Sequence, residues 1–514
     1  MKKAFRLLLL VAAPGFLGLH TLSAQTPSTG QPVATSTPMA LSLQQAINYA
    51  LQNKSTLQAT RINEKVAQAR VGEIRATGLP QVNASATVTD NYKLQRSLVD
   101  FGAFGGPQLE GATLTQADIN AAQSGQQVTL QPAYREAVPM PPQPLAFGLQ
   151  WQGNGSVQAS QMLFNGSYLL GLKAAKVYEA LSVKQTQQSE IEVMEQVSKA
   201  YYSTLVARER LQLLARNVQR LDTLLYQTKQ TFEEGFVEKL DVDRLQVQVN
   251  NLKIEQQNAQ RLVDLSVALL KFQMGLDQRQ PVELTDNLDG AVVDAETERQ
   301  RLNAGLSTDF NYSNRIEYSV LETQRDLAVL DVRNRRSGYL PTLNAVASYG
   351  FIGSDRTLGG LMEFRGPNSR AESGFLNQNW FGFGNIGLQL QIPIFDGFRK
   401  KYSIEQGKLA LEQVNKGFTT LQQSIDLQRA QTQTTLQNTL DVLANQKANL
   451  DLATNVARVA KIKFQEGVGS NLEVITAETD LRQAQTNYYA ALYDVLVAKV
   501  DYNKASGSLS TPGK

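Results

Sequence analysis

The sequence of 514 residues contains no cysteine and a single histidine, His20. Without cysteine there is no disulfide scaffold and no acyl anchor on an N-terminal cysteine. Beyond position 20 the chain also lacks the commonest general base, a thiol nucleophile and the softer metal ligands. The composition therefore argues against an enzyme and predicts no cofactor and no metal site.

Long apolar runs are also absent, because no stretch approaches the roughly 18 apolar residues of a transmembrane helix. The chain opens with MKKAFR, LLLLVAAPGFLGL and TLSAQ, the order of a basic region, a short apolar region and a small-residue cleavage site. Pro-Gly interrupts the apolar run, which favours a signal peptide over a membrane anchor. We predict a signal peptide over 1–24, cut after Ala24, and a flexible segment over 25–40.

An excess of one charge is lacking too. The full chain has 50 Lys+Arg and 47 Asp+Glu, and the charges before the proposed cut are Lys2, Lys3 and Arg6. The mature chain is therefore close to neutral, so no basic face for nucleic acid is predicted. An exported chain without a transmembrane helix or an acyl anchor is either soluble or a β-barrel in an outer membrane.

The sequence does contain an internal duplication. Residues 161–166 read QMLFNG and residues 392–397 read IPIFDG, so that aligned positions stand 231 apart. Four further matches occur in the same order: LPQVNA with LPTLNA, FEEG with FQEG, LDV with LEV, and Gly275 with Gly507. We predict two repeats over 41–276 and 311–507, a connecting segment over 277–310 and a tail over 508–514. The first repeat carries about 30 extra residues in a Gly/Pro-rich loop over 101–144.

Two proline-free stretches permit long helices. No proline lies between Pro144 and Pro281, or between Pro393 and Pro512, and proline breaks helix interiors. Apolar residues recur there at spacings of three and four over many turns, which is typical of a coiled coil. A continuous helix over 167–231 would be about 100 Å long at ~1.5 Å per residue.

Period-2 alternation predicts four strands, over about 80–92, 149–164, 341–352 and 380–395. One face of these strands is apolar and the other carries uncharged polar side chains, which suits a lipid-facing, water-lined barrel. A soluble sheet with one wet face would alternate in the same way, but the signal peptide and the lack of a second apolar layer favour the barrel. The predicted lumen-lining residues are Gln150, Asn154, Gln158, Asn385 and Gln389.

Four strands cannot close a barrel in lipid, since the edge strands would leave backbone groups unpaired. Three chains would supply 12 strands, which makes a cyclic homotrimer the favoured assembly. Each strand pair needs a junction with a long helix, and Asn-Gly or Asp-Gly tolerates the left-handed conformation that lets the chain bend there. The predicted strand–helix junctions are Pro80, Asn165, Gly166, Pro341, Asp396 and Gly397.

The order of these elements, with Leu-Pro before a strand, Phe-Asn/Asp-Gly after one, and Gly followed by Leu-Asp/Glu-Val, resembles the TolC family of outer-membrane efflux proteins. The resemblance spans about 40–507. It implies a mainly α fold with a transmembrane part: a trimeric 12-stranded β-barrel in the outer membrane, continued by a periplasmic α-helical barrel. It also implies three partners, namely outer-membrane lipid, a periplasmic adaptor and an inner-membrane pump.

The resemblance further implies two kinds of site at the helix-to-helix turns. The adaptor-docking tips would be Gly235, Phe236 and Val237 in the first repeat, and Gly467, Val468 and Gly469 in the second. The gate candidates are Asp241 and Glu473; Arg244 and Thr476 stand where some relatives carry a second acidic residue. The simpler alternatives are that the glycines only end helices and that the carboxylates only complement helix dipoles.

The predicted function is a passive outer-membrane exit channel of a tripartite efflux system, for drugs, other toxic molecules or metal ions. One alternative within the fold is the exit channel of a type I protein-secretion system. One alternative of another class is a periplasmic coiled-coil scaffold. A carboxylate-based polysaccharide hydrolase is a further alternative, but no motif in the sequence supports that hydrolase.

Overall fold

The computed structural model describes residues 38–99, 108–135, 141–288, 297–300, 302 and 310–509. The predicted signal peptide with Ala24 lies outside these residues, as do parts of the 101–144 loop, the 277–310 segment and the tail. The chain forms two compact units, and the long helices α5 (Gly166–Glu233) and α10 (Arg399–Gln465) contribute to both of them. Across the described residues, no helix has the length and apolarity to cross a membrane.

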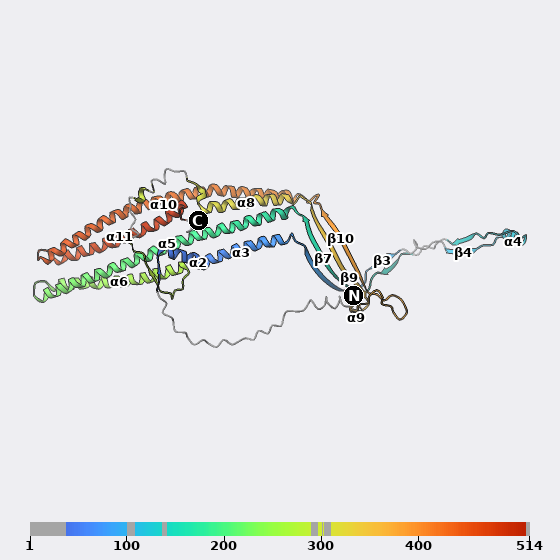
Figure 1. The fold of residues 1–514 in the computed structure, drawn as a ribbon, viewed down its shortest axis with the longest axis horizontal. Helices are drawn as coiled ribbons and strands as arrows, with labels where there is room; N and C mark the ends of the chain where they lie inside the picture. Colours follow the sequence, from blue (N-terminus) through green and yellow to red (C-terminus); the bar gives the residue numbers. More distant parts are fainter. Residues whose placement is uncertain are drawn as a thin grey trace. The chain divides into compact units, whose positions relative to one another are not determined.

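One unit contains a four-stranded antiparallel sheet in the order β10-β9-β7-β2 (Figure 1). Its strands are β2 (Gln81–Asp90), β7 (Trp151–Phe164), β9 (Thr342–Asp355) and β10 (Trp380–Gln391). The predicted strand over 380–395 therefore ends four residues early. Pro393 explains the shorter strand, because proline has no N–H to donate to a ladder.

The register of the sheet separates two faces. Asn83, Gln158, Ser348 and Asn385 are paired across the four strands and form one polar row. Because side chains alternate along a strand, their neighbours share the opposite face, where Val82, Val157, Leu388 and Leu390 lie exposed. The predicted alternation of a polar and an apolar face is thus present in the folded sheet.

The same unit contains α3 (Ser55–Ala76), the short η2 (Tyr312–Asn314) and α8 (Ile316–Ser337), together with two connections at the end of the sheet. The connection after β2 is not simply a loop. It includes β3 (Arg96–Val99) paired with β6 (Gln143–Ala146), β4 (Gln108–Ala112) paired with β5 (Pro132–Arg135), and α4 (Gln116–Gln123). In the second repeat, α9 (Leu358–Met362) takes this place, and its Leu361 carbonyl accepts a bond from the Trp380 indole N–H at 2.9 Å.

The other unit is built from two helical hairpins. α5 returns as α6 (Lys239–Met274), and α10 returns as α11 (Asn471–Ser506) (Figure 1). Their shared core takes side chains from all four helices: Leu224, Leu225, Val242, Leu245, Val249, Ala457, Ala460, Val474, Ile475, Ala477 and Leu481. The predicted 3/4 spacing thus places apolar side chains between the hairpins. α5 is 68 residues long, which confirms the predicted continuous helix.

This unit also contains α2 (Leu43–Asn53) and a small parallel pairing of β1 (Met39–Leu41) with β8 (Val282–Leu284). Tyr201, at the centre of α5, is fully buried and donates to the Leu41 carbonyl at 3.1 Å and to the Asp286 carboxylate at 2.8 Å. A Tyr hydroxyl in a core needs such partners. These bonds attach the N-terminal segment and the connecting segment to the long helix.

Candidate functional site

Both helix-to-helix turns end their first helix in the same way. Gly235 has φ 86° and Gly467 has φ 76°, the left-handed conformation of a helix C-cap. In the first turn the Phe236 N–H donates to the Thr231 carbonyl, and in the second the Val468 N–H donates to the Lys463 carbonyl, both at 3.0 Å. The glycines therefore do end helices, as the simpler alternative predicted.

The same turns are exposed surfaces. Phe236 and Val468 are 79% and 78% exposed, and Val237 is half-buried. Gly469 serves a different purpose from Gly467, because a Cβ on it would lie 2.9 Å from the Lys463 Cβ. That glycine allows a close return of the chain. The predicted docking residues are thus positioned where a partner could reach them.

The two gate candidates occupy the first turns of the returning helices. Asp241 lies in the first turn of α6, and its Oδ1 is 3.8 Å from the Arg244 guanidinium. Glu473 lies in the first turn of α11, where its N–H donates to the Ser470 hydroxyl at 3.2 Å. Both positions suit a carboxylate at the positive end of a helix. The helix-start role is therefore observed, and a gating role remains a proposal.

Asn471 connects the two turns. Its Nδ2 donates to the main-chain carbonyl of Asp241 at 3.3 Å, and the side chain is buried. The contact joins the start of α11 to the start of α6, next to both gate candidates. The sequence does not single out Asn471, because its partner Asp241 lies 230 residues away in the chain.

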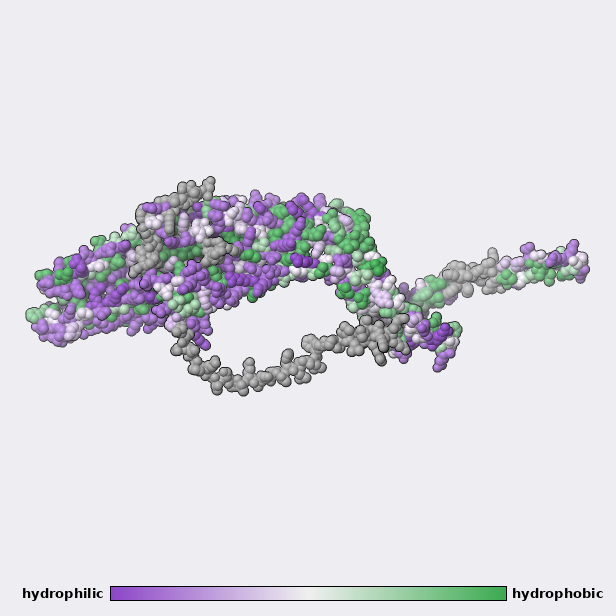
Figure 2. Space-filling model, viewed as in Figure 1, coloured by the Kyte–Doolittle hydropathy of each residue, from purple (hydrophilic) through white to green (hydrophobic). Residues whose placement is uncertain are grey.

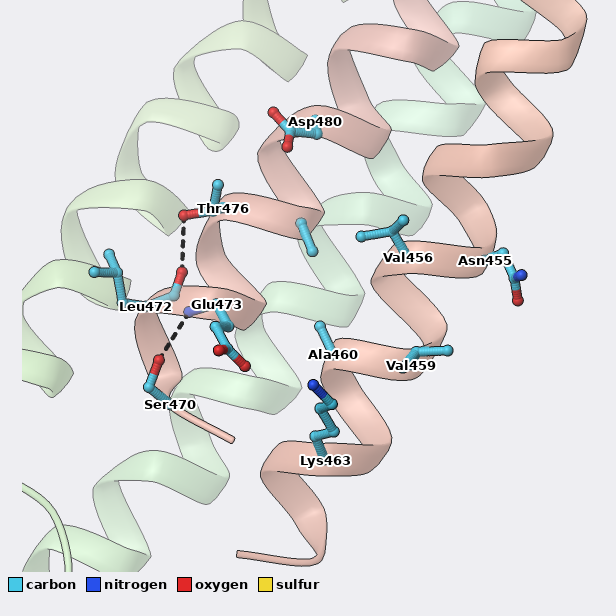
Figure 3. A pocket seen from close by; sticks show the side chains of 11 residues that line it. Asn455, Val456, Val459, Ala460, Lys463, Ser470, Leu472, Glu473, Thr476 and Asp480 are labelled. Carbon is cyan, nitrogen blue, oxygen red and sulfur yellow. Dashed lines mark hydrogen bonds between the residues drawn. The ribbon is translucent and has the colours of Figure 1, made fainter. Parts of the chain in front are cut away.

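A groove of about 570 Å³ lies between α10 and α11, directly behind the second turn (Figure 3). Glu473 and Lys463 lie on its two sides, and exposed Val456, Val459 and Leu472 supply apolar surface. The groove therefore combines exposed apolar surface with one carboxylate and one ammonium beside the second turn.

An ion pair with a buried carboxylate crosses from one hairpin to the other. The Glu478 carboxylate of α11 is 2.7 Å from the Arg220 guanidinium of α5, and its side chain is 8% exposed. Nearby, the Glu255 carboxylate of α6 meets Arg482 of α11 at 2.9 Å and Arg210 of α5 at 3.6 Å. Sequence reasoning missed these residues. The signal in the sequence that could have found them is Glu478, a charged residue among the regularly spaced apolar residues of α11.

Four of the five lumen candidates share the polar face of the sheet. Asn154 and Gln158 lie on β7, and Asn385 and Gln389 lie on β10. The strand register places all four side chains on the same face of the sheet. The Ser348 hydroxyl donates to the Asn385 side-chain carbonyl at 2.7 Å. Gln150 differs because it precedes β7, and its amide donates to Asp90 at 3.1 Å. Gln150 is therefore not part of the strand row.

The two strand-to-helix junctions are built differently. At the first, the Asn165 side chain caps α5 by accepting from the N–H groups of Ser167 at 2.9 Å and Tyr168 at 3.2 Å. Gly166 does not have a left-handed φ, so that expectation was wrong. Its glycine is explained by packing instead, since a Cβ would lie 2.7 Å from Leu340 Cδ1.

At the second junction the left-handed expectation is confirmed, with φ 64° at Gly397 and also at Phe398. Asp396 caps α10, because its Oδ2 accepts from the Lys400 N–H at 3.1 Å. Pro80 and Pro341 directly precede β2 and β9, as the predicted junctions require.

The architecture of paired strands and long helical hairpins is shared with a known protein family. The sequence model of the outer membrane efflux protein family matches residues 150–276 and 312–508. The chain belongs to the outer membrane efflux protein family. Among its curated relatives, the outer membrane protein TolC of Escherichia coli is 21% identical over 359 residues, which cover 70% of this chain and 70% of that protein. The probable efflux pump outer membrane protein TtgC of Pseudomonas putida is 24% identical over 375 residues, covering 70% and 69%.

Solved structures of the family share the fold. CusC, described in a study of transmembrane channel formation, superposes with a TM-score of 0.62 at 15% identity, covering 90% of this chain and 91% of that one. The Campylobacter jejuni CmeC outer membrane channel gives 0.61 at 14% identity, covering 92% and 87%. The predicted fold class, duplicated strand pairs with long coiled-coil helices, is thereby confirmed.

Proposed function

We propose that this chain is a passive exit channel in the bacterial outer membrane, working as a homotrimer in a tripartite efflux system. The observation that carries the proposal is the sheet, with one apolar face and one uncharged polar face. Within the part of the chain that the structure describes, its edge strands β2 and β10 are each unpaired on one side. The strands alternate in direction from β2 to β10, so the β10 of one copy can pair antiparallel with the β2 of the next. Closure with three copies gives 12 strands, lipid outside and water inside.

The helical turns are the proposed site of assembly with a periplasmic adaptor, which would connect the channel to an inner-membrane pump. Exposed Phe236 and Val468, together with the groove behind the second turn, supply apolar contact surface. In a trimer, Asp241 and Glu473 would each form a ring of carboxylates that attracts cations. The uncharged polar row on the sheet suits a weakly selective duct for small molecules.

One relative is named for a second cargo class, protein secretion. The proteases secretion protein PrtF of Dickeya chrysanthemi is 20% identical over 328 residues, covering 62% of this chain and 65% of that protein. The same channel could therefore serve protein secretion, and the pump with which it assembles would decide between the two cargo classes. Crosslinking in cells followed by identification of the captured pump separates them.

Fractionation and conductance test the channel itself. The full-length protein should appear in the outer-membrane fraction and conduct ions in planar bilayers. Recovery in the soluble periplasmic fraction would instead support a scaffold. Glu473→Lys should lower the preference for cations, measured as a shift in reversal potential under a salt gradient. Asp451→Lys, an exposed change on α10 outside the groove, is the matched control. An unchanged potential in Glu473→Lys would remove that residue from the gate.

A further inference from the structure

The second strand–helix junction carries charges that the first one lacks. Residues 399–401, in the first turn of α10, read Arg-Lys-Lys, whereas the repeat-related residues 168–170 of α5 read Tyr-Leu-Leu. The N-terminus of a helix is its positive end, so cations in the first turn are unfavourable. The first turn of α10 contains no acidic residue that would offset them. An external anion would remove this electrostatic conflict.

One of the three cations is compensated within the chain. The Lys400 ammonium is 3.6 Å from the Asp396 carboxylate and lies 5.2 Å from the centre of the Tyr339 ring. Arg399 and Lys401 are exposed, and neither has a carboxylate partner among the residues that the structure describes. Two cationic side chains are therefore available to a ligand on this surface.

Exposed aromatic rings surround these cations. Lys401 lies 6.0 Å from the Phe398 ring centre and 5.7 Å from that of Tyr402, and Phe395 packs edge-on against Phe398 at 5.6 Å. These three rings are 59% to 76% exposed. Phe398 also has φ 64°, a strained conformation for a bulky residue that persists only where surrounding structure or function maintains it.

Apolar surface leads from the sheet to this cluster. Ile392 and Ile394, between β10 and α10, are 59% and 95% exposed. Figure 2 shows apolar residues gathered where the strands meet the long helices. Aliphatic, aromatic and basic side chains thus follow one another within residues 392–402, which we name the basic-aromatic collar. Aromatic rings and snorkelling cations in this order are typical of a membrane–water interface.

We propose that the basic-aromatic collar binds the headgroups of anionic phospholipids at the periplasmic surface of the outer membrane, with Arg399 and Lys401 as the phosphate ligands. The inference rests on the proposed function, because it needs the sheet to be in a membrane. Charge complementarity identifies an anion, and the adjoining exposed isoleucines and phenylalanines identify one that carries acyl chains. A soluble phosphate would leave that apolar surface uncovered.

Binding of dansyl-phosphatidylglycerol to the purified full-length protein in neutral detergent micelles tests the proposal, with dansyl-phosphatidylcholine as the zwitterionic probe. Wild type should prefer phosphatidylglycerol. Arg399→Gln/Lys401→Gln should weaken the binding of phosphatidylglycerol roughly 10- to 30-fold, because each basic residue near an anionic headgroup contributes a factor of about three to five in affinity. The binding of phosphatidylcholine should be unaffected. Arg399→Lys/Lys401→Arg keeps both charges and should keep the preference.

Lys173→Gln/Lys176→Gln is the matched control, because it removes two exposed cations from α5 near the first junction. An equal loss in this control would overturn the assignment to the collar. Displacement of the lipid by inorganic phosphate at equal concentration would overturn the lipid as ligand. If wild type conducts in phosphatidylcholine bilayers yet shows no preference for phosphatidylglycerol, the lipid-binding inference is contradicted, whereas the proposed channel function is supported. A wild type that neither conducts nor fractionates with membranes contradicts the proposed function itself.

Discussion

The two repeats of the chain each contain a buried cation at the same place, and they neutralise it differently. In the first repeat the Lys54 ammonium donates to the side-chain carbonyls of Gln196 at 2.8 Å and Gln273 at 3.0 Å. Lys54 is 8% exposed, and burial lowers the pKa of its ammonium from the ordinary value of 10.5. Among the described residues, this ammonium therefore has two amide carbonyls as partners and no carboxylate, although the charge would be more stable in water.

In the second repeat Arg315 stands 261 positions after Lys54 and is 4% exposed. Its guanidinium donates to Gln428 and to the Ala505 carbonyl, both at 3.0 Å, and forms two 3.1 Å bonds with the Glu317 carboxylate. Gln428 is the repeat partner of Gln196, but Thr56 stands where Glu317 would be. Duplication has therefore kept the position of the cation and of one amide, whereas only the second repeat supplies a counter-charge.

The backbone next to each cation is the same in both repeats. Gly275 has φ 73° and Gly507 has φ 74°. A Cβ on Gly275 would lie 2.8 Å from the Lys54 Cα, and one on Gly507 would lie 2.6 Å from the Asn314 carbonyl oxygen. Shared geometry with diverged chemistry shows that the close approach of two backbones is the stricter requirement.

The largest expected effect comes from breaking that shared geometry. Gly275→Ala and Gly507→Ala should each lower the free energy of unfolding by about 3 kcal/mol, because a left-handed alanine is strained and its Cβ meets backbone. Urea unfolding followed by circular dichroism measures the change. Gly235→Ala and Gly467→Ala are the controls, since both glycines are left-handed but have nothing within 4 Å of an added Cβ. A loss in the controls as large as in the test variants would show that strain alone decides.

The next largest loss of stability is expected at a position where one repeat has a carboxylate and the other has an amide. Glu478 of α11 is buried against Arg220, and its repeat partner is Gln246 of α6, which accepts from Lys229 at 3.1 Å. Glu478→Gln should cost about 2 kcal/mol, because it leaves a partly buried guanidinium without its carboxylate. The measurement is again urea unfolding.

An exposed ion pair gives the matched control for Glu478. Asp222 and Lys253 are 3.0 Å apart, and their side chains are 42% and 48% exposed. Asp222→Asn should change stability by less than about 0.5 kcal/mol, because solvent screens such a pair. Equal losses in Asp222→Asn and Glu478→Gln would contradict a special role for the buried pair between the hairpins.

Local chemistry explains what the sequence could predict. The left-handed glycines at 235, 467 and 397, the strands and the long helices follow from residue type, alternation and the positions of proline. Each of these signals acts within a few residues of chain. They can therefore be recognised without the tertiary structure.

The missed features depend on which surfaces meet. Nothing local distinguishes Gly166, where an added Cβ would meet the Leu340 side chain after α8, from the left-handed Gly397. Asn471 and Glu478 are not singled out by the sequence, because their partners Asp241 and Arg220 lie more than 200 residues away in the chain. Burial of a polar side chain is decided by the packing of hairpins, which periodicity alone does not position.

The smallest expected effect concerns the cation without a carboxylate. Lys54→Met should change stability at neutral pH by no more than about 1 kcal/mol, because it removes a desolvated charge together with its amide bonds. Arg315→Met should cost about 2 kcal/mol, since Glu317 loses its bidentate partner. Both differences from wild type are measured by urea unfolding across a pH series.

The pH series separates the two cations. The folded pKa of Lys54 lies below its unfolded value of 10.5, so between these two values the unfolded state binds more protons and wild type gains stability as pH rises. Lys54→Met lacks this gain, and wild type should therefore become more stable relative to it as pH rises towards 10.5. Arginine is a residue type that proteins do not deprotonate, so the difference between wild type and Arg315→Met should not vary with pH. A constant difference for Lys54→Met would mean that its two amides stabilise the ammonium as well as water does, and the contrast between the repeats would vanish.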